Sequence, residues 1–563
     1  MALKATLAAV LVCVVIGVGA APAQPSLLYA EERRCGFDLL HERTRGTRVL
    51  GTSRAGSVSG NRTFAVAAAE PWQPIRIAVF TDDITDSRRH CTRAGEVRPT
   101  FDGTTTVCTS DDVLTKGKRW ALLEFLIPSA IELHTERLSV QRQSGNLIVD
   151  PSIQRDTICG QFSIPASHMT TGVPNADFVL YMSAAPTEGS VAAWALECQA
   201  FQNGRPSVGV ANVSPKYLAS TPDTVRIVTH ELLHALGFGI ETFTRRRMVS
   251  HFQLRGKDML VGITSANVLA RARQQFGCDT QAFMELEDRG GAGTAFSHWK
   301  RRDAKDELMA GISGAGIYSA LSIAVMEDTG YYKGNYSNAE PMAYGKNAGC
   351  ELTSKKCVID GVSQFPQMFC NSSRKSFSCA SDRFGIGDCD LTTYASDMPS
   401  AFRYFTDPRL GGSDPLMDFC PFVRTYGNAN CTVNTNLLEG SVFGVAARCL
   451  DTPSGFSMGG SKFLQAGICA EVECNRSTYG VRVAGASKFT ACTPGRKLDL
   501  SSVSSSFSEG SFICPSYESV CGMKIDAALY EKYEAIIADS SMAGVRASVM
   551  AVVAILLIVL LMA

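Results

Sequence analysis

The sequence lacks an excess of charge of either sign. Lysine plus arginine and aspartate plus glutamate each total 54 among 563 residues, so the formal net charge is zero. A chain without a surplus of positive charge lacks the electrostatic footprint of a nucleic-acid or polyanion binder. We therefore expect no nucleic-acid partner, and the function has to be argued from local motifs.

Histidine is also scarce, with only eight residues in the chain, yet two of them lie four positions apart as His230 and His234. Residues at this spacing share one face of a helix, so both imidazoles reach one metal ion and Glu231 reaches a water on it. A Thr-Pro pair at 221–222 supplies an N-cap and a first helical residue, and Gly237 can end the helix. The motif predicts a zinc-binding helix.

The N-terminus has no apolar run long enough to span a bilayer. Residues 7–18 are apolar, Lys4 precedes them, and Ala-Pro-Ala at 21–23 follows them. This arrangement predicts a signal peptide over residues 1–23 that is removed on export, with a retained anchor or a buried helix as alternatives.

The C-terminal residues 547–563 are apolar apart from Ser548, and no basic residue follows them. A spanning helix normally leaves a cytoplasmic basic cluster, whereas a short tail that is cut off is typical of a glycolipid-anchor signal. We assign 541–563 to such a signal and keep a single-pass helix as the alternative. Either one predicts a membrane-anchored protein on the extracellular surface, reached through the secretory pathway.

Twenty cysteines in an exported chain predict disulfides. If Cys13 leaves with the signal peptide and Cys35 with a propeptide, an even number remains. An odd number of these lies between Cys91 and Cys278, and another odd number between Cys350 and Cys521. Full pairing therefore needs at least one disulfide across that boundary.

Sequons of the Asn-x-Ser/Thr type fit an exported glycoprotein, and each needs a surface position if it is used. They are Asn61, Asn212, Asn335, Asn371, Asn430 and Asn475.

Residues 24–68 read as a propeptide, because they are turn-rich and basic and show no sustained periodicity. A lone thiolate from Cys35 in this segment can take the open position on zinc and keep a protease latent. The alternative is a disulfide elsewhere, and the even count of the other cysteines favours the latch.

The strand and helix signals predict an α+β domain. Residues 75–80, 178–182 and 207–211 have the composition of strands, and 113–140 has helical spacing interrupted at Pro128. The strand nearest the metal can bind a peptide substrate by strand addition. Residues 317–325 predict a further helix. From Cys350 onward, cysteines, glycines and short apolar runs predict a disulfide-rich domain of strands and loops.

A zinc protease needs a third protein ligand. His251 is the nearest downstream histidine, Glu285 or Glu287 can supply a carboxylate, and His298 follows a glycine-rich turn. Met309 comes shortly after His298, and a methionine turn beneath a three-histidine zinc site is the metzincin arrangement.

The motifs at 230–238, 290–293, 297–298 and 306–310, with a long insertion between the second and third histidines, resemble the leishmanolysin family of surface metalloproteases. The resemblance implies His298 as the third ligand and Met309 as the floor of the site. It also implies a metzincin-like catalytic domain, with a twisted mixed sheet and an active-site helix, split by the insertion. The boundaries we expect are 69–237 and 238–340 for the two catalytic parts, and 341–540 for the Cys-rich C-terminal domain.

The expected activity is zinc-dependent cleavage of peptide bonds in protein substrates. One Zn²⁺ on His230, His234 and His298 lowers the pKa of its water, and Glu231 acts as general base and then protonates the leaving amine. The alternative is a catalytically silent surface adhesin on the same fold. The complete set of ligands and base favours the enzyme, with adhesion as a possible added role.

Overall fold

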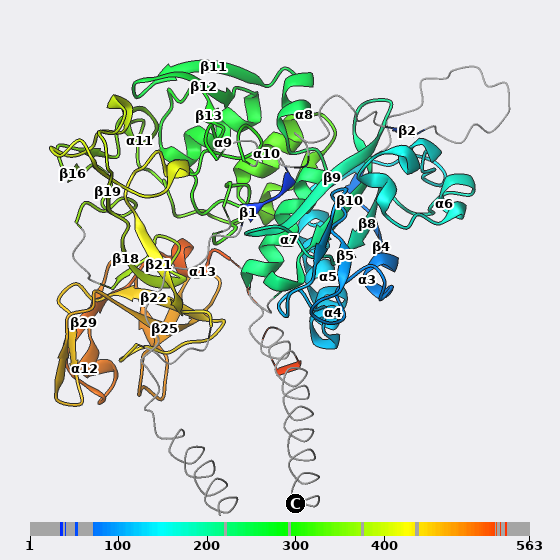
Figure 1. Cartoon of the computed structure of the whole chain (residues 1–563). Helices are drawn as coiled ribbons and strands as arrows, with labels where there is room; N and C mark the ends of the chain where they lie inside the picture. The colour runs from blue at the N-terminus through cyan, green and yellow to red at the C-terminus, as the bar shows by residue number, and fades with distance from the viewer. Residues whose placement is uncertain are drawn as a thin grey trace, which may run out of the picture.

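The computed structural model describes residues 34–37, 40, 51–53, 71–218, 222–290, 294–312, 314–372, 377–433, 438–523, 525, 530 and 535–536. The predicted signal peptide, the anchor signal, Thr221 and Asn61 lie outside this part of the chain. The fold is a β-rich α+β structure stapled by disulfides, as expected from the sequence (Figure 1).

The helix that carries the HExxH motif, α7 (Pro222–Ala235), rests on a six-stranded sheet. Its main order is β1 (Arg34–Cys35), β9 (Val191–Phe201), β10 (Pro206–Val213), β8 (Phe178–Ser183) and β4 (Ile77–Phe80), and β2 (Gly51–Ser53) also pairs with β9. Only the β9–β10 pair is antiparallel. The predicted strands over 75–80, 178–182 and 207–211 are confirmed. β8 and β10 are buried along their whole length, which explains why apolar residues predominate in both, with Ser183, Ser207 and Asn212 as buried polar exceptions.

The predicted helix over 113–140 is in fact a series of shorter pieces that ends earlier. Helix α4 (Lys116–Ala121) continues through a π-helical turn (Leu122–Leu126) into α5 (Ile127–Thr135), and strand β7 (Leu138–Gln141) follows. The regular α-helix is interrupted just before Pro128, close to the expected position, by the π-helical turn. Pro128 occupies the first turn of α5, where the widened π turn before it accommodates the missing N–H.

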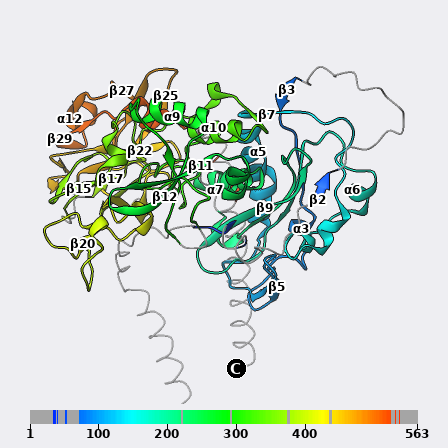
Figure 2. The same cartoon turned by 90° about the horizontal axis from the view of Figure 1, so that it is seen from above.

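Helix α7 (Pro222–Ala235) carries the HExxH motif and begins at Pro222, as predicted. It lies between the blue-to-cyan sheet and the green elements that follow it in the chain (Figures 1 and 2). These elements are α8 (Ile240–Arg245), β11 (Val249–Leu254), β12 (Lys257–Ile263), α9 (Ala266–Phe276), β13 (Met284–Glu285) and α10 (Ala320–Asp328). Helix α10 begins later than the predicted 317–325 because the Ser319 side chain caps it at Leu321 N.

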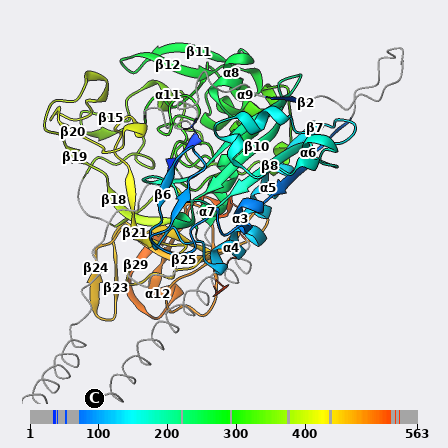
Figure 3. The same ribbon diagram turned by 45° about the vertical axis from the view of Figure 1, so that its right-hand side comes forward.

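The C-terminal region consists mainly of short strands. An eight-stranded sheet has the main order β24 (Ser461–Phe463), β23 (Phe456–Met458), β29 (Phe507–Ile513), β22 (Ala447–Asp451), β25 (Gly467–Cys474), β26 (Tyr479–Arg482) and β27 (Thr490–Cys492), with β28 (Lys497–Asp499) beside β29. Its strands lie together with α12 (Leu500–Val503) at one end of the molecule (Figures 1 and 3). They enclose a hydrophobic core of their own.

Smaller elements connect these parts. They are β3 (Trp72–Pro74), α3 (Asp82–Thr85), β5 (Val97–Pro99), β6 (Thr105–Val107), α6 (Ala166–Thr170), β14 (Lys333–Gly334), α11 (Glu351–Ser354), β15 (Val358–Ile359), β16 (Val362–Ser363), β17 (Ser378–Cys379), β18 (Gly385–Cys389), β19 (Thr392–Thr393), β20 (Leu410–Gly411), β21 (Val423–Asn430) and α13 (Tyr517–Cys521). Among the described helices, none combines the length and apolarity needed to cross a bilayer.

The cysteine arithmetic is confirmed. All cysteines from Cys91 to Cys521 pair in nine disulfides, and Cys278–Cys350 is the bridge across the predicted boundary. Cys35 belongs to no disulfide in the described part of the chain. This extensive pairing indicates an oxidising, extracellular-type compartment.

Candidate metal centre

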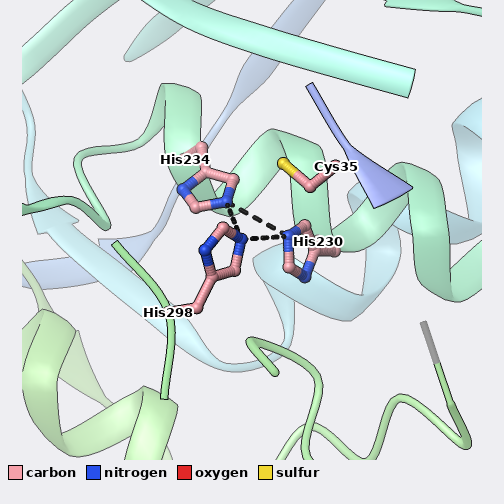
Figure 4. A group of neighbouring side chains, drawn as sticks. All are labelled: Cys35, His230, His234 and His298. Carbon is pink, nitrogen blue, oxygen red and sulfur yellow. Dashed lines mark hydrogen bonds between the residues drawn. The ribbon is translucent and has the colours of Figure 1, made fainter. Parts of the chain in front are cut away.

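Three imidazoles converge on one point (Figure 4). The Nε2 atoms of His230, His234 and His298 lie 3.1 to 3.2 Å from one another, and all three side chains are buried. A tetrahedral zinc ion with Zn–N bonds of about 2.05 Å holds its nitrogen ligands about 3.3 Å apart. The triangle of Nε2 atoms therefore has nearly the size of the one formed by three nitrogen ligands around a tetrahedral zinc ion.

The hydrogen bonds on the far side of each ring fix its tautomer. The Nδ1 atoms of His230, His234 and His298 lie 2.6, 2.7 and 2.9 Å from the carbonyl oxygens of Leu308, Phe238 and Thr294. A carbonyl only accepts, so each Nδ1 donates and each Nε2 keeps its lone pair. Three buried lone pairs that face one another cannot hydrogen-bond among themselves. They fit a bound cation.

Burial keeps His230 in the neutral form that a metal ligand requires. Desolvation is the main cause that lowers the pKa of His230 to about 3, and the nearby His298 lowers it further. Glu231, between the two helical histidines, is 2% exposed. Helix α7 thus presents two imidazoles and a carboxylate close together, as its spacing predicted.

The alternatives to His298 do not lie at the metal centre. His251 is exposed on β11, Glu285 pairs with Arg255 at 2.8 Å, and Glu287 pairs with Lys300 at 2.6 Å. Among the described residues, the group able to hold a metal contains the three histidines and Cys35.

Met309 lies in a tight turn that adjoins the segment carrying His298, since Trp299 N donates to Met309 O at 2.9 Å. Ala310 N donates to Glu307 O, and Leu308 between them is the residue whose carbonyl holds His230. Glu307 organises the turn, because its carboxylate accepts from Met309 N at 2.6 Å and from Ser319 Oγ at 2.7 Å. Burial raises the pKa of Glu307 to about 7, and the hydrogen bond from Met309 N opposes that rise. Met309 itself is fully buried in the core, where a methionine floor is expected.

The segment around Cys35 reaches the same centre. Strand β1 runs parallel to the edge of β9 and brings the Cys35 sulfur within 4.8 Å of the histidine nitrogens. The thiol donates a hydrogen bond to Glu231 Oε2 at 3.2 Å. Cys35 therefore contacts the Glu231 carboxylate and lies beside the three histidines (Figure 4 shows Cys35 and the histidines).

Phe37 is a contact that sequence reasoning missed. Its ring stacks on His234, with centroids 4.2 Å apart and planes inclined by 5°. Gly36 permits this approach, since a Cβ there would lie 2.8 Å from Val191 Cγ1. An aromatic residue two positions after the cysteine was the available signal.

A pocket opens beside His230 and Glu231. It is lined mainly by apolar and glycine residues, namely Cys35, Ala192, Arg226, Ile227, His230, Glu231, Leu308, Ala310, Gly311, Gly314 and Gly316. Arg226 is locked in its wall by a bidentate pair with Glu340, at 2.7 Å for both bonds. Gly316, with φ of +67°, packs on Arg226, and a Cβ at this position would lie 2.6 Å from Arg226 Cβ. The sequence did not reveal this buried pair.

The sequons differ in accessibility. Asn335, Asn371 and Asn475 are exposed, and Asn430 is half-buried. Asn212 does not meet the surface requirement stated above. It is fully buried in β10, and its amide exchanges hydrogen bonds with Ala185 N and O.

An HExxH helix on a mixed sheet, with a third histidine completing a cation-sized triangle, defines the class of protein: a metallopeptidase. The chain belongs to the leishmanolysin family, whose model matches residues 50–527. It is 41% identical to leishmanolysin of Leishmania donovani over 93% of this chain and 92% of that protein, and 40% identical to leishmanolysin of Leishmania major over 92% and 90%. A leishmanolysin-like peptidase of Drosophila melanogaster is 26% identical over 66% of this chain and 70% of that protein.

Proposed function

We propose that this protein is a zinc metalloendopeptidase of the metzincin type, made as a latent zymogen for the cell surface. The single observation that carries the proposal is the triangle of lone pairs from His230, His234 and His298 beside Glu231. Bound there, zinc would supply a Lewis acid that polarises the substrate carbonyl and lowers the pKa of water.

The residues around the metal divide the remaining work. The three histidines hold the ion, and their backbone hydrogen bonds keep the rings from rotating. Glu231 accepts the proton of the attacking water and then delivers it to the leaving amine. Its burial favours this role, because a carboxylate held in a site that excludes water can exchange protons with the reactants directly.

Strand β9 is the surface we assign to a peptide substrate. Its outer edge borders the metal centre and bonds the β1 segment, where Gly36 N donates to Ala193 O at 3.0 Å. A substrate that adds to the same edge would place its scissile bond at the histidines. The pocket beside His230 would then receive an apolar side chain next to that bond.

The β1 segment is the proposed latch. The Cys35 sulfur can fill the position on zinc that water needs, and it already engages Glu231. While Phe37 covers His234, a substrate cannot take the same edge of β9. Activation therefore requires removal of this segment, which we assign to the propeptide 24–68.

The remaining proposals concern place and organisation. We propose catalytic parts at 69–237 and 238–340, a C-terminal domain at 341–540, and a membrane anchor signal at 541–563. Glycans are proposed at Asn335, Asn371, Asn430 and Asn475. The complete set of ligands and base favours a peptidase over the silent adhesin.

Casein hydrolysis by the processed protein tests the proposal. We expect activity that 1,10-phenanthroline abolishes, and a Glu231→Gln variant that still binds zinc but is inactive. His251→Ala, which changes an exposed histidine outside the centre, is the matched control and should retain full activity. Equal hydrolysis by the wild type, the chelator-treated enzyme and Glu231→Gln would refute the zinc mechanism.

A further inference from the structure

A buried cluster of charged residues lies next to the segment that carries His298. The proposed chemistry does not use this cluster. Its cations are Arg255, Lys257 and Lys300, and its anions include Glu285, Glu287, Asp288 and Asp418. A buried ion cluster is costly unless its members are closely paired, and as a stability device it is a weak choice. A role in fixing one arrangement of the chain explains it better.

The cluster adjoins the segment 298–300, which presents His298. Glu287 N donates to His298 O at 2.9 Å, and Lys300 N donates to Glu285 O at 2.9 Å. On the other side, Trp299 N donates to Met309 O at 2.9 Å. Residues 298–300 are therefore held between the 285–287 segment and the Met309 turn.

The Glu287 side chain also binds the residues that follow His298. Its Oε1 accepts from Lys300 Nζ at 2.6 Å, and its Oε2 accepts from Arg301 N at 3.0 Å. Both Glu287 and Lys300 are fully buried. The ion pair between Lys300 and Glu287 thus helps to fix the backbone just after His298.

Lys300 is held in turn by Asp418, which belongs to the C-terminal region. Lys300 Nζ lies 2.8 Å from Asp418 Oδ1, and Asp418 also contacts Lys257 at 3.0 Å and Arg255 at 3.3 Å. The Asp418 carboxylate therefore contacts three cations. Arg255 and Lys257 precede β13 in the chain, and Lys300 follows it.

The backbone around Asp418 is itself tightly fixed. Asp418 has φ of 53°, a left-handed conformation that aspartate tolerates better than most residues, and Tyr404 Oη donates to its carbonyl at 2.6 Å. Cys420, two residues later, is bonded to Cys357. Asp418 is an anchor point rather than a mobile surface charge.

We propose that Asp418 is a positioning residue for the metal centre: it holds Lys300, and through Lys300 and Glu287 it fixes the segment 298–300 that presents His298. The Cys-rich region is on this view a part of the zinc site and not only a scaffold or a substrate-binding surface. The inference rests on the proposed zinc function.

The test is the zinc affinity of the full chain, measured by competition with a chromophoric chelator. We expect Asp418→Asn to weaken zinc binding about 3- to 30-fold, the size of effect expected when a substitution acts on a site through intervening residues. The Co²⁺-substituted variant should also show an altered visible spectrum, because His298 no longer holds its place. Asp407→Asn is the control, since the Asp407 side chain is 43% exposed and its ion pair in the described part of the chain is a local one with Arg409. It should match the wild type within about twofold.

The outcomes separate the two proposals. If the wild type binds no zinc, the metal centre itself is wrong. If the wild type binds zinc and a folded Asp418→Asn has the same affinity and cobalt spectrum as Asp407→Asn, only the positioning role is overturned. Lys257→Met provides a second test should Asp418→Asn fail to fold. It removes one partner of Asp418, so a smaller loss of zinc affinity supports the role and an unchanged affinity overturns it.

Discussion

Replacing Phe37 with alanine should release latency while leaving the Cys35 thiol in place. Phe37 is 6% exposed and lies flat on the His234 ring at 4.2 Å. Truncating a buried phenylalanine costs about 3 kcal/mol at the low end of the usual range. The loss falls on the closed state of the zymogen alone, because the ring has no such contact once the segment detaches. At about 1.4 kcal/mol per factor of ten, the open fraction should rise roughly 100-fold.

Hydrolysis of a quenched fluorescent peptide by the unprocessed zymogen measures this fraction directly. Phe37→Ala should show a correspondingly higher initial rate, limited by the rate of the fully processed enzyme. Cys35 should also react faster with a thiol reagent. Phe489→Ala removes a phenylalanine that is 36% exposed and distant in sequence, and it should behave as the wild type. A folded Phe37→Ala zymogen with unchanged initial rate and thiol reactivity would refute the stacking argument.

Three further predictions concern the latch, the zinc helix and the third ligand. Cys35→Ser should give a prematurely active zymogen, since a hydroxyl is a poor substitute for thiolate on zinc, and unchanged latency in the peptide assay would contradict this. His134 donates to Thr229 O on α7, and burial lowers its pKa to about 3, so its contribution to stability is present above pH 6.5 and is lost as pH falls toward 3. In urea unfolding across that window, His134→Gln should reduce the pH slope by about 1.4 kcal/mol per pH unit, and an identical slope would count against it. Gly311→Ala should lower zinc affinity and kcat/KM, because a Cβ there would collide with Thr294, whose carbonyl holds His298; normal values would show that the loop can yield.

Local sequence predicted the elements whose structure is decided locally. Strands β8 and β10 are buried and mainly apolar, and α7 begins at Pro222, so pattern and structure agree. The sequence predicted an interruption at Pro128 but not its form, a π-helical turn that precedes the proline. Asn212 was misread because a sequon carries no information on burial, and only the pairing of β10 with two neighbours shows that the side chain is inside.

In the candidate site, too, residues that are close in sequence could be predicted, whereas residues brought together by the tertiary fold could not. Two ligands and the base could be predicted because they share one helical turn. His298 could not be chosen from spacing, since its distance from α7 is closed by tertiary pairing with 285–287 and the Met309 turn. The parity of the cysteines did isolate Cys35. Neither the stacking of Phe37 nor the contact between Lys300 and Asp418 has a local signature, because each joins segments that only the folded chain brings together.

The zinc content of the purified protein tests the three-histidine centre most directly. After dialysis against a weak chelator, elemental mass spectrometry should find one zinc ion per wild-type chain and per His251→Ala chain. His298→Ala should retain well under half of that amount, since two histidines remain as ligands. Full zinc occupancy in a folded His298→Ala protein, or none in the wild type, would contradict the account.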